Sequence, residues 1–81
     1  MAHVVVNSEC AAFTGGVTEF DVAADTVRRL VAELDARFPG LGEFVDRRMA
    51  VAIDGEIHQD AWLSPIGPDS EVYLIPKIGG G

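Results

Sequence analysis

The 81-residue sequence predicts one α+β domain, in which a main helix covers a mixed sheet of four or five strands. Three observations lead to this fold class. Apolar residues recur at helical spacing between Val27 and Phe38. Short β-branched or alternating segments lie on both sides of that stretch, and Asp54-Gly55 is a tight-hairpin signal between two of them. We place the domain at residues 1–76 and a flexible C-terminal glycine tail at residues 77–81.

The N-terminal part is expected to form a hairpin. Residues 3–6 are a β-branched run typical of a buried strand, and residues 17–22 partly alternate between apolar and polar side chains. Thr14-Gly15-Gly16 is a turn signal, and residues 10–13 are expected to be a loose connection.

The main helix is predicted over residues 25–38. Asp25 is a plausible N-cap, and Pro39-Gly40 ends the helix because proline cannot continue it. One face carries the apolar stripe, which consists of Val27, Leu30, Val31, Leu34 and Phe38.

The C-terminal part is expected to supply the remaining strands. One further helical turn is predicted at residues 41–45, followed by strands at 49–53, 56–58 and 71–75, and Pro76 ends the regular structure. The predicted core consists of Val5, Phe20, Val27, Leu30, Val31, Leu34, Ile53, Val72 and Leu74.

The charge balance excludes several classes of function. The sequence has six basic and thirteen acidic residues, which gives a formal net charge of −7. Such a surface repels nucleic acids and anionic membranes and attracts basic protein partners. No signal peptide or membrane-length apolar run is visible, and Cys10 is the only cysteine, so we expect a cytoplasmic protein without disulfides.

No group of residues predicts a catalytic or metal site. His3 and His58 lie far apart without clustered ligands, and Cys10 is more typical of a packing residue than of a sulfur-bearing nucleophile. We therefore expect no bound cofactor. Three apolar side chains are candidates for docking a partner: Trp62, Tyr73 and Ile75.

The tail is the unusual feature of the sequence. Glycines lose the most entropy on ordering and have no side chain to pack, so Gly79-Gly80-Gly81 is either a frayed terminus or a functional arm. From Pro76 the extended chain reaches roughly 17 Å. Lys77, Ile78 and the glycines could thread a narrow channel in a partner, but the terminal carboxylate, with a pKa of about 3.5, must be activated before it reacts.

Several segments resemble the ubiquitin-like sulfur carriers. They are Phe13-Thr14-Gly15-Gly16, the stretch 34–41, the acidic turn 67–71, and the ending 72–81. This family includes the small subunit of molybdopterin synthase, the thiamine-pathway carrier and the carrier of thiocarboxylate-dependent cysteine synthesis. The resemblance extends over essentially the whole chain and implies a β-grasp fold.

The resemblance also implies a function for the terminal carboxylate. A ubiquitin-activating-type enzyme uses ATP and Mg²⁺ to adenylate it, a sulfur donor converts it to a thiocarboxylate, and a sulfur-accepting biosynthetic enzyme receives the sulfur. Molybdopterin and cysteine synthesis are the pathways we favour. The chain itself is then a protein co-substrate or small subunit, not an enzyme. The family usually ends in two glycines, so either Gly81 reacts directly, which we favour, or the tail is trimmed to Gly80.

Two other hypotheses remain open on the same residues. A ubiquitin-like modifier would use the activated glycine to form isopeptide bonds with other proteins. A plain interaction module would have no use for the glycines.

Overall fold

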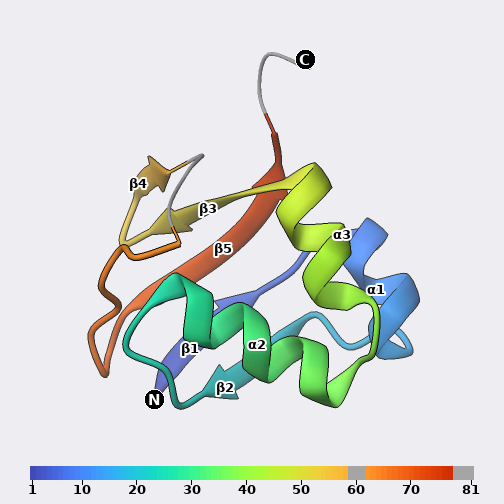
Figure 1. Ribbon diagram of the computed structural model, residues 1–81, viewed down its shortest axis with the longest axis horizontal. Coiled ribbons are helices and arrows are strands. Elements are labelled where there is room, and N and C mark those ends of the chain that lie inside the picture. The colour runs from blue at the N-terminus through green and yellow to red at the C-terminus, as the bar shows by residue number, and fades with distance from the viewer. Residues whose placement is uncertain (59–61, 78–81) are drawn as a thin grey trace.

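The computed structural model describes residues 1–58 and 62–77 (Figure 1). Within this part of the chain, one sheet and three helices confirm the α+β class. The strands are β1 (Ala2–Val5), β2 (Glu19–Val22), β3 (Met49–Ile53), β4 (Glu56–His58) and β5 (Glu71–Pro76). The helices are α1 (Ser8–Thr14), α2 (Val27–Arg37) and α3 (Leu41–Arg48).

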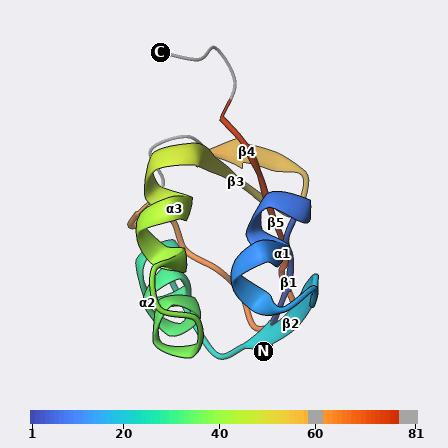
Figure 2. The same ribbon diagram turned by 90° about the vertical axis from the view of Figure 1, so that its right-hand side faces the viewer.

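The sheet is mixed, as predicted, with the order β2-β1-β5-β3-β4. β5 lies in the centre, parallel to β1 and antiparallel to β3, and the other neighbouring pairs are antiparallel. Helices α2 and α3 cover one face, as the side view in Figure 2 shows, and α1 contacts α3 at one end of the sheet. No helix of the described residues lies on the opposite face of the sheet, which we call the open face.

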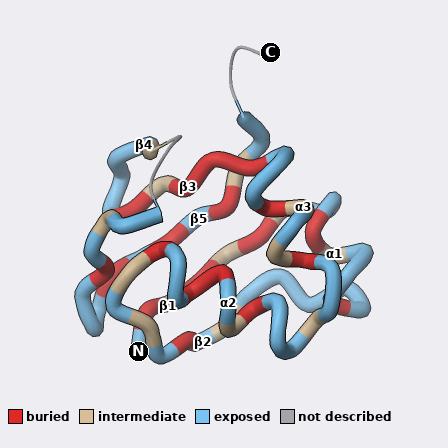
Figure 3. Tube along the Cα trace, viewed as in Figure 1, coloured by how far each residue is buried: buried red, intermediate tan, exposed pale blue. Residues whose placement is uncertain are grey.

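The core lies between the sheet and α2, where buried segments of several strands face the helix (Figure 3). The predicted stripe is confirmed: its four residues within α2 are buried, and Phe38 packs against the core from the edge. Phe20 also packs there as a half-buried residue. The prediction for Val5 was wrong, because β1 alternates: Ala2 and Val4 face the helix, and Val5 is half-buried on the open face.

The predicted loose connection at residues 10–13 is in fact part of α1. The Asn7 side chain caps the helix by accepting a hydrogen bond from the Cys10 backbone N–H, and Gly15 ends it in the left-handed conformation with φ 69°. Cys10 is fully buried and anchors the helix to the core. The strands of the predicted hairpin do pair, but a helix joins them.

The N-cap of α2 is Thr26 rather than the predicted Asp25. The Thr26 side chain accepts from the Arg29 backbone N–H, whereas the Asp25 carbonyl accepts from Ile66. Helix α3 is longer than the single turn predicted at residues 41–45. Burial of Leu41 and Val45, four residues apart, places one face of α3 against the core.

The Asp54-Gly55 hairpin turn is confirmed, with φ of 48° and 89° at the two residues. The Asp54 carboxylate accepts hydrogen bonds from the Glu71 backbone N–H and the Ser70 hydroxyl, so it fixes the start of β5 to the turn. Strand β5 ends at Pro76, one residue later than the predicted strand at 71–75, because Pro76 still pairs with Met49. The flexible tail stays a prediction, because residues 78–81 lie outside the described part of the chain.

Candidate partner-docking site

The base of the predicted tail is fixed against the end of α3. The Lys77 backbone N–H donates to the carbonyl of Arg48 at 3.0 Å, and the Lys77 ammonium donates to the carbonyl of Asp46 at 2.8 Å. These carbonyls belong to the last turn of α3, which has no further helical donors and favours a cation through the helix dipole. Two hydrogen bonds therefore hold Lys77 against the end of α3.

An apolar row crosses the open face beside Lys77. Cross-strand register places Tyr73 between Val5 and Ala52, and Ala52 opposite Ile57, so the row spans β1, β5, β3 and β4. Tyr73 is 46% and Ile57 53% exposed. Ile75 lies on the same face, opposite Ala50 and two residues before Lys77. We call this surface the docking face; it consists of Val5, Ala52, Ile57, Tyr73 and Ile75.

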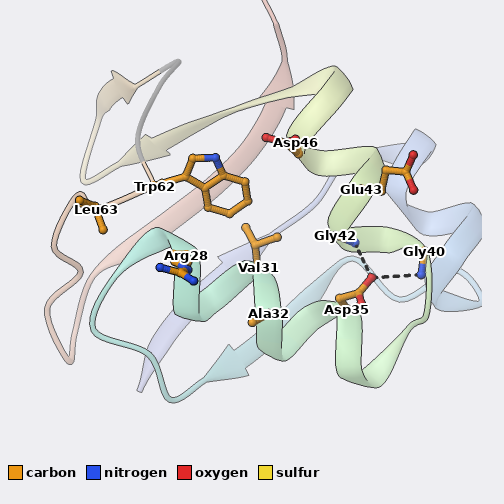
Figure 4. Close-up of a pocket in the computed structure, with 10 residues that line it drawn as sticks. All are labelled: Arg28, Val31, Ala32, Asp35, Gly40, Gly42, Glu43, Asp46, Trp62 and Leu63. Atoms are coloured by element: carbon orange, nitrogen blue, oxygen red, sulfur yellow. Dashed lines mark hydrogen bonds between the residues drawn. The ribbon is translucent and has the colours of Figure 1, made fainter.

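The structure separates the three side chains predicted to dock a partner. Tyr73 and Ile75 lie together on the docking face. Trp62 lies on the other side of the sheet, beside α2 and α3 (Figure 4). The predicted roles of Ile78, Gly79, Gly80 and Gly81 fall outside the described residues.

Sequence analysis missed three residues of the docking face: Val5, Ala52 and Ile57. Val5 had been assigned to the core, and the other two were not singled out. Only the pairing register brings these residues beside Tyr73, since they come from three other strands. The alternation of β5, in which Val72 and Leu74 are buried and Tyr73 is exposed, was the one signal in the sequence.

His3 joins three strands at one end of the open face. Its Nδ1 lies 2.7 Å from a carboxylate oxygen of Glu71 on β5, and its Nε2 lies 2.9 Å from one of Glu19 on β2. The hydrogen bond to Glu71, followed by that to Glu19, raises the pKa of His3 above 6.5 despite some desolvation. The protonated imidazole can donate to both carboxylates at once, whereas the neutral ring can donate to only one.

These two hydrogen bonds of His3 predict that the stability of the fold depends on pH. Because the pKa of His3 is raised on folding, its contribution is complete below pH 6.5 and is lost as pH rises through the folded-state pKa. In denaturant titrations, the free energy of unfolding of the parent protein should therefore fall, relative to His3→Gln, as pH rises above 6.5. The matched control keeps His3 and neutralises both partners, Glu19→Gln with Glu71→Gln. The same pH dependence in that control would contradict the assignment.

Comparison with known proteins supports a family assignment. The family model described as the ThiS family matches residues 4–81, which is nearly the whole chain. The chain belongs to the ThiS family. No curated protein matched in a sequence search.

Solved structures similar to this ThiS-family protein share its β-grasp fold. CysO in the Amycolatopsis orientalis BexX/CysO complex has a TM-score of 0.86 at 16% identity, with each chain covered completely. Mycobacterium tuberculosis CysO has a TM-score of 0.85 at 17% identity, covering 96% of this chain and 100% of that one. SAMP1, a small archaeal modifier protein, from Haloferax volcanii has a TM-score of 0.70 at 25% identity, covering 99% and 98%.

The described residues of this ThiS-family protein offer little chemistry of their own. Burial raises the pKa of the Cys10 thiol, which disfavours the nucleophilic thiolate and agrees with a packing role. Within residues 1–58 and 62–77, no group of three or more His, Cys, Asp or Glu side chains is arranged to hold a metal ion. In the same ranges, no helix is both long and apolar enough to cross a membrane.

Proposed function

We propose that this ThiS-family protein is a sulfur carrier that reacts through the carboxylate of Gly81. An activating-type enzyme transfers AMP from ATP to this carboxylate and releases pyrophosphate. Hydrosulfide from a sulfur donor then attacks the acyl carbon, the C–S bond forms as the C–O bond to AMP breaks, and loss of the thiol proton leaves a thiocarboxylate. The resulting thiocarboxylate supplies sulfur to a biosynthetic enzyme, with molybdopterin or cysteine synthesis as the favoured pathways. The chain acts as a co-substrate.

The observation that carries the proposal is the position of the docking face beside the tail base. Ile75 is on that face, and Lys77, two residues later, is fixed to the end of α3. A partner that covers Tyr73 and Ile75 therefore lies close to Lys77, which is four residues before the reacting terminus in the sequence. Holding the reacting group in a defined place converts a slow encounter into an effectively intramolecular step. The solved BexX/CysO complex supports the expectation that such a chain works with a protein partner.

A charge on the docking face should weaken the carrier's interaction with its activating enzyme. Tyr73→Asp places a carboxylate on a surface that is apolar across four strands, and the loss of a central aromatic anchor commonly costs tenfold or more in affinity. In an ATP–pyrophosphate exchange assay with the activating-type enzyme of the same organism, KM for the carrier should rise about tenfold or more, with kcat changed little.

The control for this experiment is Val17→Asp, which introduces the same charge at an apolar residue that is 49% exposed, precedes β2 and is not one of the five residues of the docking face. Its KM should stay at the parent value. An equal rise in KM for both variants would show that general negative charge is responsible. An unchanged KM for Tyr73→Asp would remove the docking face from the proposal.

The likeness to SAMP1 favours one alternative, a ubiquitin-like modifier joined to other proteins through the same glycine. Lys77 is the only lysine, and its ammonium is bonded to the Asp46 carbonyl, so lysine-linked chains are not expected. Mass spectrometry separates the two functions, because covalent adducts on other proteins indicate the modifier and an oxygen-to-sulfur exchange in the free chain indicates the carrier.

A further inference from the structure

A second apolar surface lies on the helical side of the molecule, away from the docking face. It is a pocket of about 870 Å³ between α2, α3 and the segment that carries Trp62 and Leu63 (Figure 4). Val31 and Ala32 of α2 line it, and Glu43 and Asp46 of α3 form the opposite wall. We call this pocket the α2–α3 groove.

The segment that presents Trp62 is fixed by backbone hydrogen bonds to the start of α2. The Trp62 carbonyl accepts from the Arg28 N–H at 2.8 Å, and the Ser64 carbonyl accepts from Val27 at 3.1 Å, so both occupy free donors in the first turn of α2. The Ile66 N–H donates back to the Asp25 carbonyl at 2.9 Å. The Ile66 side chain is buried in the core, so the segment is held at both ends while the side chains of Trp62 and Leu63 stay outside.

Those side chains remain largely exposed to water. Trp62 is 41% and Leu63 77% exposed, although they are adjacent on a backbone held by hydrogen bonds. Isolated exposed apolar residues are ordinary, but two neighbours beside an apolar groove floor resemble the anchor region of an interface. The uncovered area is available to a partner at little ordering cost, because the backbone is already fixed.

The charges of the groove indicate what kind of partner fits. Glu43 and Asp46 are exposed on the α3 wall, and Asp35 lies at the far end from Leu63. Glu43 also makes an ion pair with Arg47 at 3.0 Å, but both side chains are exposed, so this pair is weak and a basic partner can compete for the carboxylate. One Asp35 oxygen already accepts from the backbone N–H groups of Gly40 and Gly42, so its role there is structural. Arg28 is the one basic residue lining the groove. The acidic wall matches the net charge of −7 and favours a basic partner.

We propose that the α2–α3 groove binds a partner protein through an amphipathic basic segment, with an apolar side chain against Trp62 and Leu63 and basic side chains toward Glu43 and Asp46. The groove and the docking face lie on opposite sides of the sheet, so one carrier can engage both partners at the same time. This inference goes beyond the proposed sulfur chemistry, and its test uses the chain alone.

Trp62 is the only tryptophan, so its fluorescence reports the groove directly. The probe is a synthetic helical peptide with leucines on one face and lysines on the other, and the matched peptide carries glutamates in place of the lysines. Titration with the basic peptide should shift Trp62 emission to shorter wavelength and perturb backbone amide NMR signals in α2 and α3. The acidic peptide should do neither.

Four variants decide whether the groove is the binding site. Trp62→Ala should weaken peptide binding about tenfold or more by calorimetry, and Trp62→Phe much less. Glu43→Gln with Asp46→Asn should weaken binding severalfold and reduce its salt dependence. Glu9→Gln with Asp69→Asn removes the same charge at exposed residues that do not line the groove, and should leave binding near the parent value. Thermal melting of each variant checks that the fold is retained.

Several results would overturn the proposal. The first is that the basic peptide does not bind, and the second is that the amide perturbations centre on Tyr73 and Ile75. The third is that the two double charge variants weaken binding equally, which would indicate attraction to net charge alone. Self-association that Trp62→Ala abolishes in sedimentation experiments would assign the groove to a second copy of the chain instead.

Discussion

Removal of Gly80 and Gly81 should abolish adenylation while leaving the fold of the ThiS-family protein intact. The shortened chain moves its carboxylate by about 3.4 Å for each residue removed, and a misplacement of about 1 Å can already cost a hundredfold in rate. Glycines bury no apolar side chain, so stability should change by no more than about a few tenths of a kcal/mol. The measurement is ATP–pyrophosphate exchange with the activating-type enzyme, alongside thermal melting of the same preparation.

A second variant separates the position of the carboxylate from access to it. Gly80→Phe keeps the chain length and adds a bulky side chain that blocks a narrow channel, so exchange should again be lost and the melting temperature retained. Undiminished exchange in the truncated protein would show that the C-terminal carboxylate is not the reacting group. The plain interaction module would then become the better hypothesis.

Leu34→Ala should destabilise the protein by about 2–5 kcal/mol, which is a large share of the total stability of a small domain. Leu34 is fully buried on α2 and belongs to the core cluster beneath the sheet. Truncation removes buried methyl groups and leaves a cavity in a core too small to refill it. Urea denaturation, with the slope compared between parent and variant, measures the change.

The matched control is Leu63→Ala, which removes the same atoms from a residue that is 77% exposed. Its free energy of unfolding should stay within about 0.5 kcal/mol of the parent value. Equal losses in the two variants would show that the Leu34 side chain does not occupy the core position described.

Sequence periodicity was sufficient for the elements whose pattern is local. The spacing of Val27, Leu30, Val31 and Leu34 identified α2 because one helical face must be apolar to cover the sheet. The strands at 49–53 and 56–58 were predicted with the bounds that the structure has, and the Asp54-Gly55 turn fixes the end of the first and the start of the second.

The errors arose where a local pattern allowed more than one structure. Helix α1 has seven residues, too few for a repeating apolar stripe, and its signals were the cap residues Asn7 and Gly15. Val4 and Val5 are adjacent in a continuous β-branched run, so the sequence alone did not decide which faces the helix. The helical state of residues 8–14 and the orientation of Val4 and Val5 both depend on packing against distant parts of the chain.

The candidate site was predictable only in part for the same reason. Tyr73 and Ile75 stood out because β5 alternates, but their neighbours on the docking face come from three other strands and depend on register. The bond between Lys77 and the Asp46 carbonyl joins residues 31 positions apart. Trp62 was singled out as an exposed aromatic, yet its place on the opposite side of the sheet required the fold.

Intact-mass spectrometry of the protein isolated from its native organism tests most directly whether the terminal carboxylate carries sulfur. A fraction of the chain should have one oxygen replaced by sulfur, located by fragmentation at the last residue and absent from protein lacking Gly80 and Gly81. A chain of unmodified mass under conditions that demand sulfur transfer, or sulfur found on Cys10 instead of the terminus, would contradict the proposed function.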